Sequence, residues 1–384
     1  MKGKKKYIVF TPFFPSDSSH IGSYIYDQVQ ALKRIGSYEI IIVKLVPYYS
    51  FEKDYSFKNI TVKIFRVLDF PFFILPSFFN SINKFRIRRF IRENKLLDNI
   101  YILHGHVSYP SAYLINSVAS NINVKTIIQH HGLDVLQLLN GRNQFTRFIN
   151  RHFLFKRSIR ELNKIDLNVS VSQKVRLELH KYKEYKPKDE FVLYNGVDTN
   201  KFYDTGRSMS DLEYFKIGCV ANFWPIKDQM TLIKAVELLI KDGISDVKLQ
   251  LIGVGQTLNE CKRYVEENKL ADFISFYPQR SHEKLNEFYN DLNLFVLPSY
   301  YEALGCVLLE AWATNTVIIS VDDQGISELL PESEKKNLLF ERKSPISLKE
   351  KIYMEYSKKR IFHFNDKYDI NNLIKQFLNY SFFN

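Results

Sequence analysis

The chain has 384 residues, of which 45% are apolar and 25% charged; these values are ordinary for a globular protein, and the length suffices for two domains. Its three cysteines, Cys219, Cys261 and Cys306, have neither metal-site spacing nor the even number of a disulfide framework. No stretch reaches the roughly 18–20 apolar residues that span a bilayer. Composition thus excludes a disulfide-stapled or membrane-spanning protein and favours a cytoplasmic one.

The formal net charge of +12 is carried by the first half of the chain. Lys and Arg outnumber Asp and Glu by 31 to 16 in residues 1–200, whereas acidic residues predominate by 26 to 23 in residues 201–384. This asymmetry favours an anionic partner: nucleic acid, an anionic membrane surface or a phosphate-bearing substrate. Solvated surface lysines explain it about equally well.

The N-terminus is basic and then apolar, like the start of a signal peptide, but Pro12 and Pro15 interrupt the apolar run. We therefore predict a first strand at Tyr7–Thr11, followed by a loop containing Gly22 and a helix over Tyr26–Ile35. Further strands of the first half are predicted at Glu39–Val46, Ile100–His104, Thr126–His130, Ile165–Val171 and Glu190–Tyr194.

A second series of strands and helices follows the polar stretch Asn200–Asp211, which we interpret as a linker. Its predicted elements are strands at Lys216–Val220, Val247–Ile252, Ile274–Tyr277, Leu292–Leu297 and Val317–Ser320, with helices over Thr231–Lys241 and from Gly305 to about Ala313. The alternation predicts an α/β fold of two Rossmann-like, doubly wound domains, 1–203 and 204–366, facing a central ligand-binding cleft. An amphipathic helix within 367–384 is expected to pack back toward the N-terminal domain.

The segment from Pro298 to Ala311 reads PSYYEALGCVLLEA and follows an apolar strand. Gly305 stands where a helix is expected to begin. The first N–H groups of such a helix and its positive dipole end suit a phosphate. Glu302 before the helix and Glu310 within it could each accept hydrogen bonds from hydroxyl groups. Taken alone, two glutamates eight residues apart are more typical of solvated helix charges.

In its context the segment resembles the Glu-x7-Glu motif of family 4 of the retaining glycosyltransferases, which have the two-domain GT-B fold. Further motifs of that family follow one another in order over nearly the whole chain. They are Phe14-Pro15 with Gly22-Ser23-Tyr24, His104-Gly105-His106, His130-His131-Gly132-Leu133-Asp134, Val169-Ser170-Val171-Ser172, Tyr194-Asn195-Gly196-Val197-Asp198 with Phe202, Lys227, and Leu251-Ile252-Gly253-Val254-Gly255. Each is weak alone, but their order favours a retaining glycosyltransferase that uses a nucleotide-sugar.

The resemblance implies a site for the donor diphosphate. Lys227 would neutralise it as a point charge, together with the backbone N–H groups near Gly305, Cys306 and Val307. Gly22 would allow the backbone of the first domain to approach the same phosphates.

The resemblance also implies sites for the sugar and the nucleoside. Glu302 would hold the transferred sugar, and His131 would lie beside it. Glu310 would hold the ribose hydroxyls. Arg280, with its neighbour Gln279, stands where the family contacts its nucleobase, and Gly253 ends a strand of the donor domain.

Some positions depart from the family pattern. Asn222 replaces an arginine five residues before Lys227, so it offers a hydrogen bond but no charge. The usual Glu-Gly-Phe-Gly is Glu302-Ala303-Leu304-Gly305, and the usual double glycine is Gln324-Gly325. These changes leave the identity of the sugar open.

The family is thought to retain anomeric configuration by front-face attack, in which the leaving phosphate takes the proton of the acceptor. The enzyme then mainly positions the reactants and stabilises charge on the diphosphate. We expect no cofactor and no metal, since lysine and a helix dipole serve the phosphates and no convincing Asp-x-Asp pair is present.

The stretch Phe70–Lys95 interleaves aromatic and basic residues, as the headgroup region of an anionic leaflet would favour. It contains Phe70, Phe72, Phe73, Phe78, Phe79, Phe85 and Phe90 with Lys84, Arg86, Arg88, Arg89, Arg92 and Lys95. A core-facing set of Phe side chains beside a solvated basic helix face explains the pattern equally well. Because the family binds its acceptor in the N-terminal domain, we expect a glycan or lipid-linked glycan acceptor, with peripheral contact to the inner face of a membrane. No nucleic-acid module accompanies the stretch.

Two other functions stay open at this point. A nucleotide-sugar epimerase of the same fold would need no separate acceptor. A non-catalytic sugar-nucleotide-binding module is the second alternative, and the Asn222 departure alone favours it.

Overall fold

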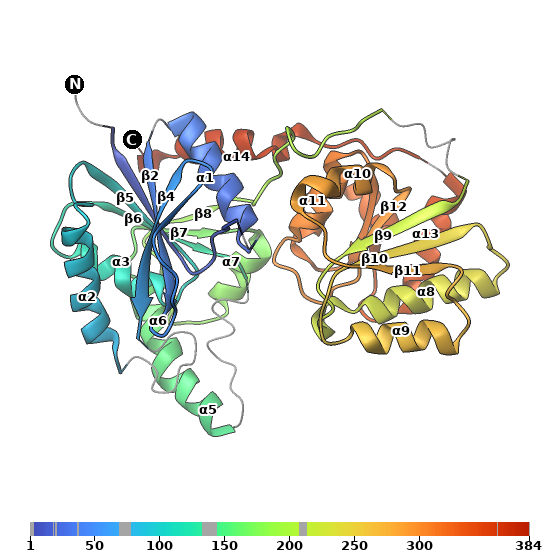
Figure 1. The fold of residues 1–384 in the computed structure, drawn as a ribbon, viewed down its shortest axis with the longest axis horizontal. Helices are drawn as coiled ribbons and strands as arrows, with labels where there is room; N and C mark the ends of the chain where they lie inside the picture. Colours follow the sequence, from blue (N-terminus) through green and yellow to red (C-terminus); the bar gives the residue numbers. More distant parts are fainter. Residues whose placement is uncertain are drawn as a thin grey trace. The chain divides into compact units, whose positions relative to one another are not determined.

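A computed structural model describes residues 4–17, 19, 21–36, 38–68, 78–132, 144–206, 213–358 and 360–383. The chain folds into two compact units (Figure 1). The first comprises Met1–Asn195 and Asn371–Asn384, and the second comprises Gly196–Ile370. Each unit is a sheet of mainly parallel strands with helices on its faces, so the predicted fold class of two Rossmann-like α/β domains is confirmed.

The first unit is built on an eight-stranded sheet of order β3-β4-β2-β1-β5-β6-β7-β8, parallel except between β3 and β4. Its strands are β1 (Lys6–Thr11), β2 (Glu39–Pro47), β3 (Tyr55–Phe57), β4 (Ile60–Val67), β5 (Ile100–His106), β6 (Lys125–His130), β7 (Leu167–Ser170) and β8 (Glu190–Val192). Strands such as β1, whose last five residues are all buried, read as continuous apolar runs because helices cover both faces.

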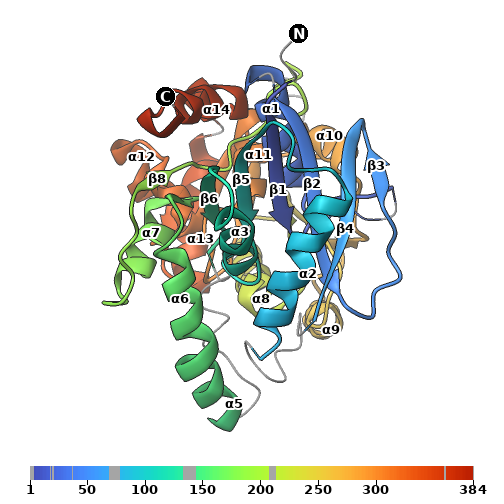
Figure 2. The ribbon, with the colours of Figure 1, turned by 90° about the vertical axis from the view of Figure 1, so that its left-hand side faces the viewer.

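Helices α2, α3 and α6 lie side by side over one face of this sheet (Figure 2). The helices of the unit are α1 (Ser23–Gly36), α2 (Asn80–Glu93), α3 (Ser111–Ala119), α5 (Gln144–Ile149), α6 (Lys156–Leu162), α7 (Gln173–His180) and α14 (Ile370–Leu378), with a π-helical segment at Asn150–Phe155. Apolar residues of α2, α3 and α6, including Ile87, Leu114 and Ile159, form one core with Ile8 and Phe10 of β1.

The second unit has a six-stranded parallel sheet of order β11-β10-β9-β12-β13-β14. Its strands are β9 (Phe215–Val220), β10 (Val247–Ile252), β11 (Ile274–Tyr277), β12 (Leu294–Leu297), β13 (Val317–Val321) and β14 (Leu339–Phe340). Its helices are α8 (Gln229–Lys241), α9 (Leu258–Glu267), α10 (Leu285–Asn290), α11 (Cys306–Ala313), α12 (Glu332–Leu338) and α13 (Pro345–Lys358). The strand order is that of a dinucleotide-binding fold. From β9 the chain adds β10 and β11 on one side of the sheet and then β12 to β14 on the other, so the strand order reverses between β9 and β12.

The division between the units follows Asn195, eight residues before the predicted boundary at 203/204. Residues soon after it pack within the second unit. Val197 pairs with Asp369, and the Asp369 carboxylate accepts a hydrogen bond from the Thr199 hydroxyl at 2.7 Å. Phe202 is buried against His282 and Tyr289. Phe202 thus ties the start of the predicted linker Asn200–Asp211 to the second unit, while residues 207–211 of that linker lie outside the described residues.

The C-terminal segment from Asn371 belongs to the first unit. Phe377 contacts Phe191, the Tyr380 hydroxyl donates to Asp189 at 2.7 Å, and the Tyr101 hydroxyl donates to the carbonyl of Phe383 at 2.8 Å. Because α14 is strongly amphipathic, burial of one face holds it in place.

Candidate functional site

Most of the predicted donor residues of the second unit follow β9 and β12, the strands between which the strand order reverses, whereas Gly253 and Arg280 follow β10 and β11. Ligands of open α/β sheets bind outside the carboxyl ends of the strands at this point. Lys227 ends a short 3-10 helix, Pro225–Lys227, after β9, and Glu302 lies in the loop after β12. The backbone N–H of Tyr300 donates to the carbonyl of Ile226 at 3.0 Å and joins the two loops.

Lys227 and Glu302, 75 residues apart in the sequence, form an ion pair. Their side chains are 27% and 13% exposed, so the pair is largely buried but still accessible to a ligand. The backbone N–H of Glu302 donates to Oε1 of Gln324 at 2.6 Å. Gln324 thus supports the Glu302 loop, a role that no sequence motif predicts.

Gly305 precedes α11 with φ at +83°, a left-handed conformation that favours glycine. The helix is fixed by its buried Leu308, Leu309 and Trp312. Its first residues, Cys306 and Val307, are half-buried. The first N–H groups of a helix lack intrahelical partners and carry its positive dipole end, which suits an anion.

Glu310 lies in α11 and is 8% exposed. Its Oε2 accepts a hydrogen bond from the Tyr289 hydroxyl at 2.8 Å, and His282 Nε2 lies 3.2 Å from its Oε1. Burial, and then the Glu310 carboxylate, raise the pKa of Tyr289 well above its usual value, so the phenol remains a donor. Two fixed partners orient the carboxylate, and its remaining lone pairs can accept hydrogen bonds from a ligand.

Asn222 and Arg280 flank this region. Asn222 is exposed, and its carbonyl accepts a hydrogen bond from the buried Gln229 side chain. The Arg280 guanidinium lies over the rings of Tyr277 and Phe288, at 5.2 and 5.3 Å from their centroids. Neither touches the Lys227–Glu302 pair in any described interaction, so their predicted donor contacts remain predictions.

Gly253 occupies a point of close backbone approach. Its φ is +151°, and a Cβ added there would lie 2.1 Å from the carbonyl oxygen of Ala221, in the loop leading to Lys227. Only a residue without a side chain fits.

Gly253→Ala is therefore expected to lower the free energy of unfolding by about 3 kcal/mol or more, since overpacking costs about 1–3 kcal/mol and left-handed strain about 1–2 kcal/mol. Urea denaturation measures it. Gly243→Ala is the matched control, because Gly243 has φ at +94° but nothing within 4 Å of an added Cβ. Equal destabilisation by both variants would contradict the close-approach explanation.

In the first unit, His131 follows β6 and lies beside residues from two other elements. Its Nε2 is 2.8 Å from Nδ1 of His106, at the end of β5, and the two rings stack 5.1 Å apart. The Tyr24 ring of α1 lies 5.0 Å from the His131 ring. His131 is only half-buried, so a ligand can reach it.

His104 and His106 continue this row into the interior. Their rings stack 4.6 Å apart, and the Tyr7 hydroxyl lies 2.7 Å from His104 Nδ1. Burial lowers the pKa of His104 to about 3 and the pKa of His106 well below its usual value. Both imidazoles are therefore neutral in the folded protein near neutral pH.

These lowered pKa values predict acid-sensitive stability. An unfolded chain holds histidine with a pKa near 6.5, so below that value the unfolded state binds more protons than the folded state. The free energy of unfolding should fall as the pH drops from about 6.5 toward about 3, by up to about 1.4 kcal/mol per pH unit for each histidine. Urea titrations across this range measure the slope, and His104→Asn should make it shallower. An unchanged slope in that variant would count against His104 as a source.

Gly22 lies in the loop that precedes α1, with φ at +89°. An added Cβ would lie 2.7 Å from the backbone of Phe13. The glycine is therefore required by the packing of the loop on itself, whether or not the loop also approaches a phosphate.

The described part of the aromatic and basic stretch at 70–95 has both exposed and core-packed side chains, and its contact with a membrane stays a prediction. Residues 70–77, and with them Phe70, Phe72 and Phe73, lie outside the described residues. On α2, Phe90 packs against the core and Phe65, whereas Ile82 and Phe85 are 48% and 65% exposed; Phe78, just before the helix, is 69% exposed.

No helix of the described residues is both long and apolar enough to cross a membrane. Within the same ranges, no group of three or more His, Cys, Asp or Glu side chains could hold a metal ion. The expectation of a metal-free reaction remains a prediction.

Comparison with known proteins identifies the family. Residues 21–201 match the model of Glycosyltransferase Family 4, and residues 206–371 match that of Glycosyl transferases group 1. The GPI3 subunit of phosphatidylinositol N-acetylglucosaminyltransferase from Saccharomyces cerevisiae (strain YJM789) is 22% identical over 329 residues, which cover 83% of this chain and 68% of that protein.

A second relative agrees, and a solved structure shares the fold. The putative teichuronic acid biosynthesis glycosyltransferase TuaC from Bacillus subtilis (strain 168) is 23% identical over 65% of this chain and 60% of its own. The structure of HepE from Anabaena in complex with UDP and glucose superposes with a TM-score of 0.70, at 16% identity over 98% of this chain and all of that one. The chain therefore belongs to family 4 of the glycosyltransferases, the glycosyl transferases group 1, and is a retaining enzyme that takes its sugar from a nucleotide-sugar.

Proposed function

We propose that the protein moves a sugar from a UDP-sugar to a glycan or lipid-linked glycan acceptor at an anionic membrane surface, in the synthesis of a surface polysaccharide or glycoconjugate. The observation that carries the donor half is the Lys227–Glu302 pair beside Glu310 and the start of α11, at the reversal point of the second sheet. UDP is the nucleotide in the HepE complex, which supports the choice of base.

In this proposal the donor diphosphate binds to the positively charged groups of the second unit. Lys227 exchanges part of its contact with Glu302 for a phosphate oxygen, and the N–H groups of Cys306 and Val307 bind a second one. Glu310, oriented by Tyr289 and His282, accepts hydrogen bonds from the ribose hydroxyls. Stabilising the charge that develops on the leaving diphosphate accounts for most of the rate enhancement.

Glu302 positions the sugar and does not attack it. A carboxylate nucleophile in a retaining glycosidase works with a second carboxyl about 5 Å away. Here the Glu302 carboxylate forms an ion pair with Lys227, which neutralises its charge, and the Gln324 side chain accepts a hydrogen bond from the Glu302 backbone. This supports front-face attack, in which the leaving phosphate accepts the proton. His131, held by His106 and Tyr24, contacts the transferred sugar.

The acceptor half rests on the first unit. Ile82 and Phe85, three residues apart on α2, are exposed, as is Phe78 just before the helix, and Arg89 and Arg92 are exposed on the same helix. Exposed aromatic residues beside cations suit the headgroup region of an anionic leaflet. The names of two relatives support such an acceptor. One is a subunit of a phosphatidylinositol N-acetylglucosaminyltransferase, and the other is a putative glycosyltransferase of teichuronic acid biosynthesis.

A transfer assay tests this function. Radiolabelled UDP-glucose, UDP-galactose and UDP-N-acetylglucosamine are each incubated with the protein, with and without vesicles carrying a polyprenyl-diphosphate saccharide. We expect one donor to label the lipid phase only when acceptor is present, and proton NMR to show the anomeric configuration of that donor in the product. Epimerisation of a donor without acceptor, or no reaction with any donor, would contradict the proposal.

A further inference from the structure

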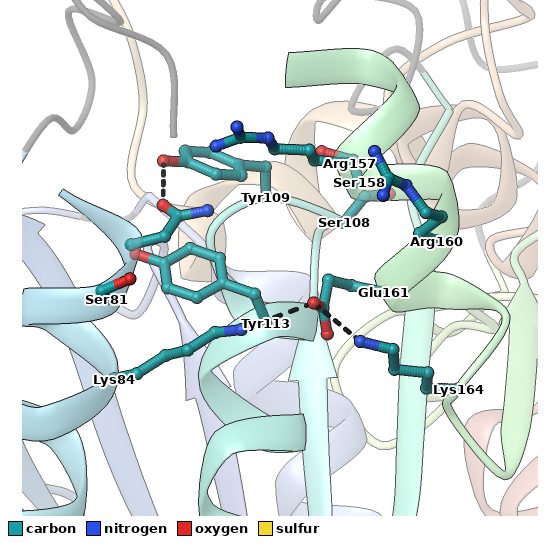
Figure 3. A pocket seen from close by; sticks show the side chains of 11 residues that line it. Ser81, Lys84, Ser108, Tyr109, Tyr113, Arg157, Ser158, Arg160, Glu161 and Lys164 are labelled. Atoms are coloured by element: carbon teal, nitrogen blue, oxygen red, sulfur yellow. Dashed lines mark hydrogen bonds and ion pairs between the residues drawn. The ribbon is translucent and has the colours of Figure 1, made fainter. Parts of the chain in front are cut away.

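A cavity of about 240 Å³ lies in the first unit, between α2, the loop after β5 and α6 (Figure 3). Because one water occupies about 30 Å³, the cavity has room for a group of several heavy atoms. Its lining is polar rather than apolar and comprises Asn80, Ser81, Lys84, Ser108, Tyr109, Tyr113, Arg157, Ser158, Arg160, Glu161 and Lys164.

Four of the lining side chains are cations and one is an anion. Lys84 from α2 and Lys164 from the turn after α6 reach Glu161 from opposite sides, at 3.5 and 3.0 Å, as Figure 3 shows. Burial opposes ionisation of Glu161, but hydrogen bonds from Asn116 and Lys164 outweigh it and lower the pKa of the carboxyl. With Glu161 ionised, Arg157 and Arg160 bring the lining to a net formal charge of +3, which suits a ligand with two or three negative charges.

A buried hydroxyl in the lining supports the same ligand. Ser158 is 4% exposed, and its Oγ has no hydrogen-bond partner among the described residues. Burying a hydroxyl without a partner costs free energy, so such a group calls for a ligand or a water. A serine hydroxyl among arginine and lysine side chains is a typical phosphate-binding set.

The cavity lies next to the proposed acceptor end of the first sheet. Ser108 belongs to the lining of the cavity, and its Oγ lies 3.1 Å from Nδ1 of His130. His130 directly precedes His131 in the sequence. On the other side, α2 contributes Ser81 and Lys84 to the cavity, while Ile82 and Phe85 of the same helix are exposed. A phosphate in the cavity would thus lie between His130, the neighbour of His131 in the sequence, and the exposed apolar side chains of α2.

From this placement we propose that the cavity binds the phosphate or diphosphate group of the membrane lipid that carries the acceptor, with the apolar side of α2 resting on the lipid surface. The inference rests on the proposed function and names the chemical class of its acceptor. Charge complementarity and the adjacent apolar face favour a lipid over a soluble phosphate.

The test uses the full chain with its donor site saturated by UDP, so that a second phosphate ligand is detected apart from the first. Arg160→Glu removes a lining cation that is exposed. Lys183→Glu, an exposed lysine outside the lining, makes a similar charge reversal elsewhere in the same unit. Calorimetry measures the binding of inorganic pyrophosphate, and co-sedimentation measures binding to phosphatidylcholine vesicles with and without phosphatidic acid.

We expect wild type and Lys183→Glu to bind pyrophosphate and the vesicles containing phosphatidic acid, and Arg160→Glu to lose affinity for both by about tenfold or more. Equal binding by Arg160→Glu would overturn the site. Binding of pyrophosphate without vesicle binding would overturn the lipid source. Failure of the proposed function can be told apart from failure of this inference. If the proposed function were wrong, the protein would not bind UDP, whereas the pyrophosphate titration would be unaffected.

Discussion

Replacing Lys227 by alanine is expected to lower kcat for sugar transfer about 10²–10³-fold, the usual effect of removing one preorganised donor from a developing anion. Lys227 is the charge that meets the leaving diphosphate in the proposed mechanism, and Asn222 cannot replace it because an amide carries no charge. The loss should be larger than in a protein that has an arginine at that position. Initial rates at saturating donor and acceptor measure it.

Lys262→Ala is the matched control, because Lys262 lies exposed on α9 of the same unit, outside the site. It should leave kcat within about twofold, as surface substitutions generally do. Lys227→Ala also leaves Glu302 without its ion-pair partner. The kcat of a double variant that combines Lys227→Ala with Glu302→Gln is therefore compared with the kcat of each single variant. A kcat near that of wild type in Lys227→Ala would remove this lysine from the mechanism.

Replacing Glu310 by glutamine should mainly weaken donor binding, whereas Glu302→Gln should mainly lower kcat. A hydrogen bond to a charged group contributes about 1.5–3 kcal/mol, so we expect the Kd for UDP to rise about 10–100-fold in Glu310→Gln. Glutamine keeps an acceptor for the buried Tyr289 hydroxyl, so the variant should remain folded. Isothermal titration calorimetry with UDP gives the Kd, and rate measurements give kcat.

The two glutamates serve as controls for each other. UDP has no transferred sugar, so Glu302→Gln should bind it about as tightly as wild type does. Glu266→Gln, on the exposed side of α9, controls for the loss of one negative charge. Equal Kd values in Glu302→Gln and Glu310→Gln would contradict the separate roles.

The sequence was sufficient for most of the fold, because buried parallel strands are continuous apolar runs. Val247–Ile252 and Ile274–Tyr277 were predicted to the residue. The hairpin of β3 and β4 was missed. Its two-residue turn at Lys58-Asn59 has positive φ at both positions but lacks the glycine that marks such turns.

Residues of the candidate site could be predicted from the sequence only where they belong to a motif. Lys227 and Glu302 were proposed separately, and the parallel sheet brings their loops together. The supporting residues were not predictable: His282 and Tyr289 meet Glu310 from 28 and 21 residues away in the sequence, and Gln324 meets Glu302 from 22. Such contacts depend on tertiary packing and leave no periodic signal. The charged cavity was missed for the same reason, since its cations come from separate helices.

Hydrogen–deuterium exchange with and without UDP tests the central claim most directly, because it locates the bound nucleotide on the intact chain. We predict slower exchange of backbone amides in residues 221–228 and 300–310, the loops and helix start that hold Lys227, Glu302 and Glu310. Protection confined to other segments, or none at a UDP concentration that saturates the protein, would contradict the assignment of the donor site to the second unit.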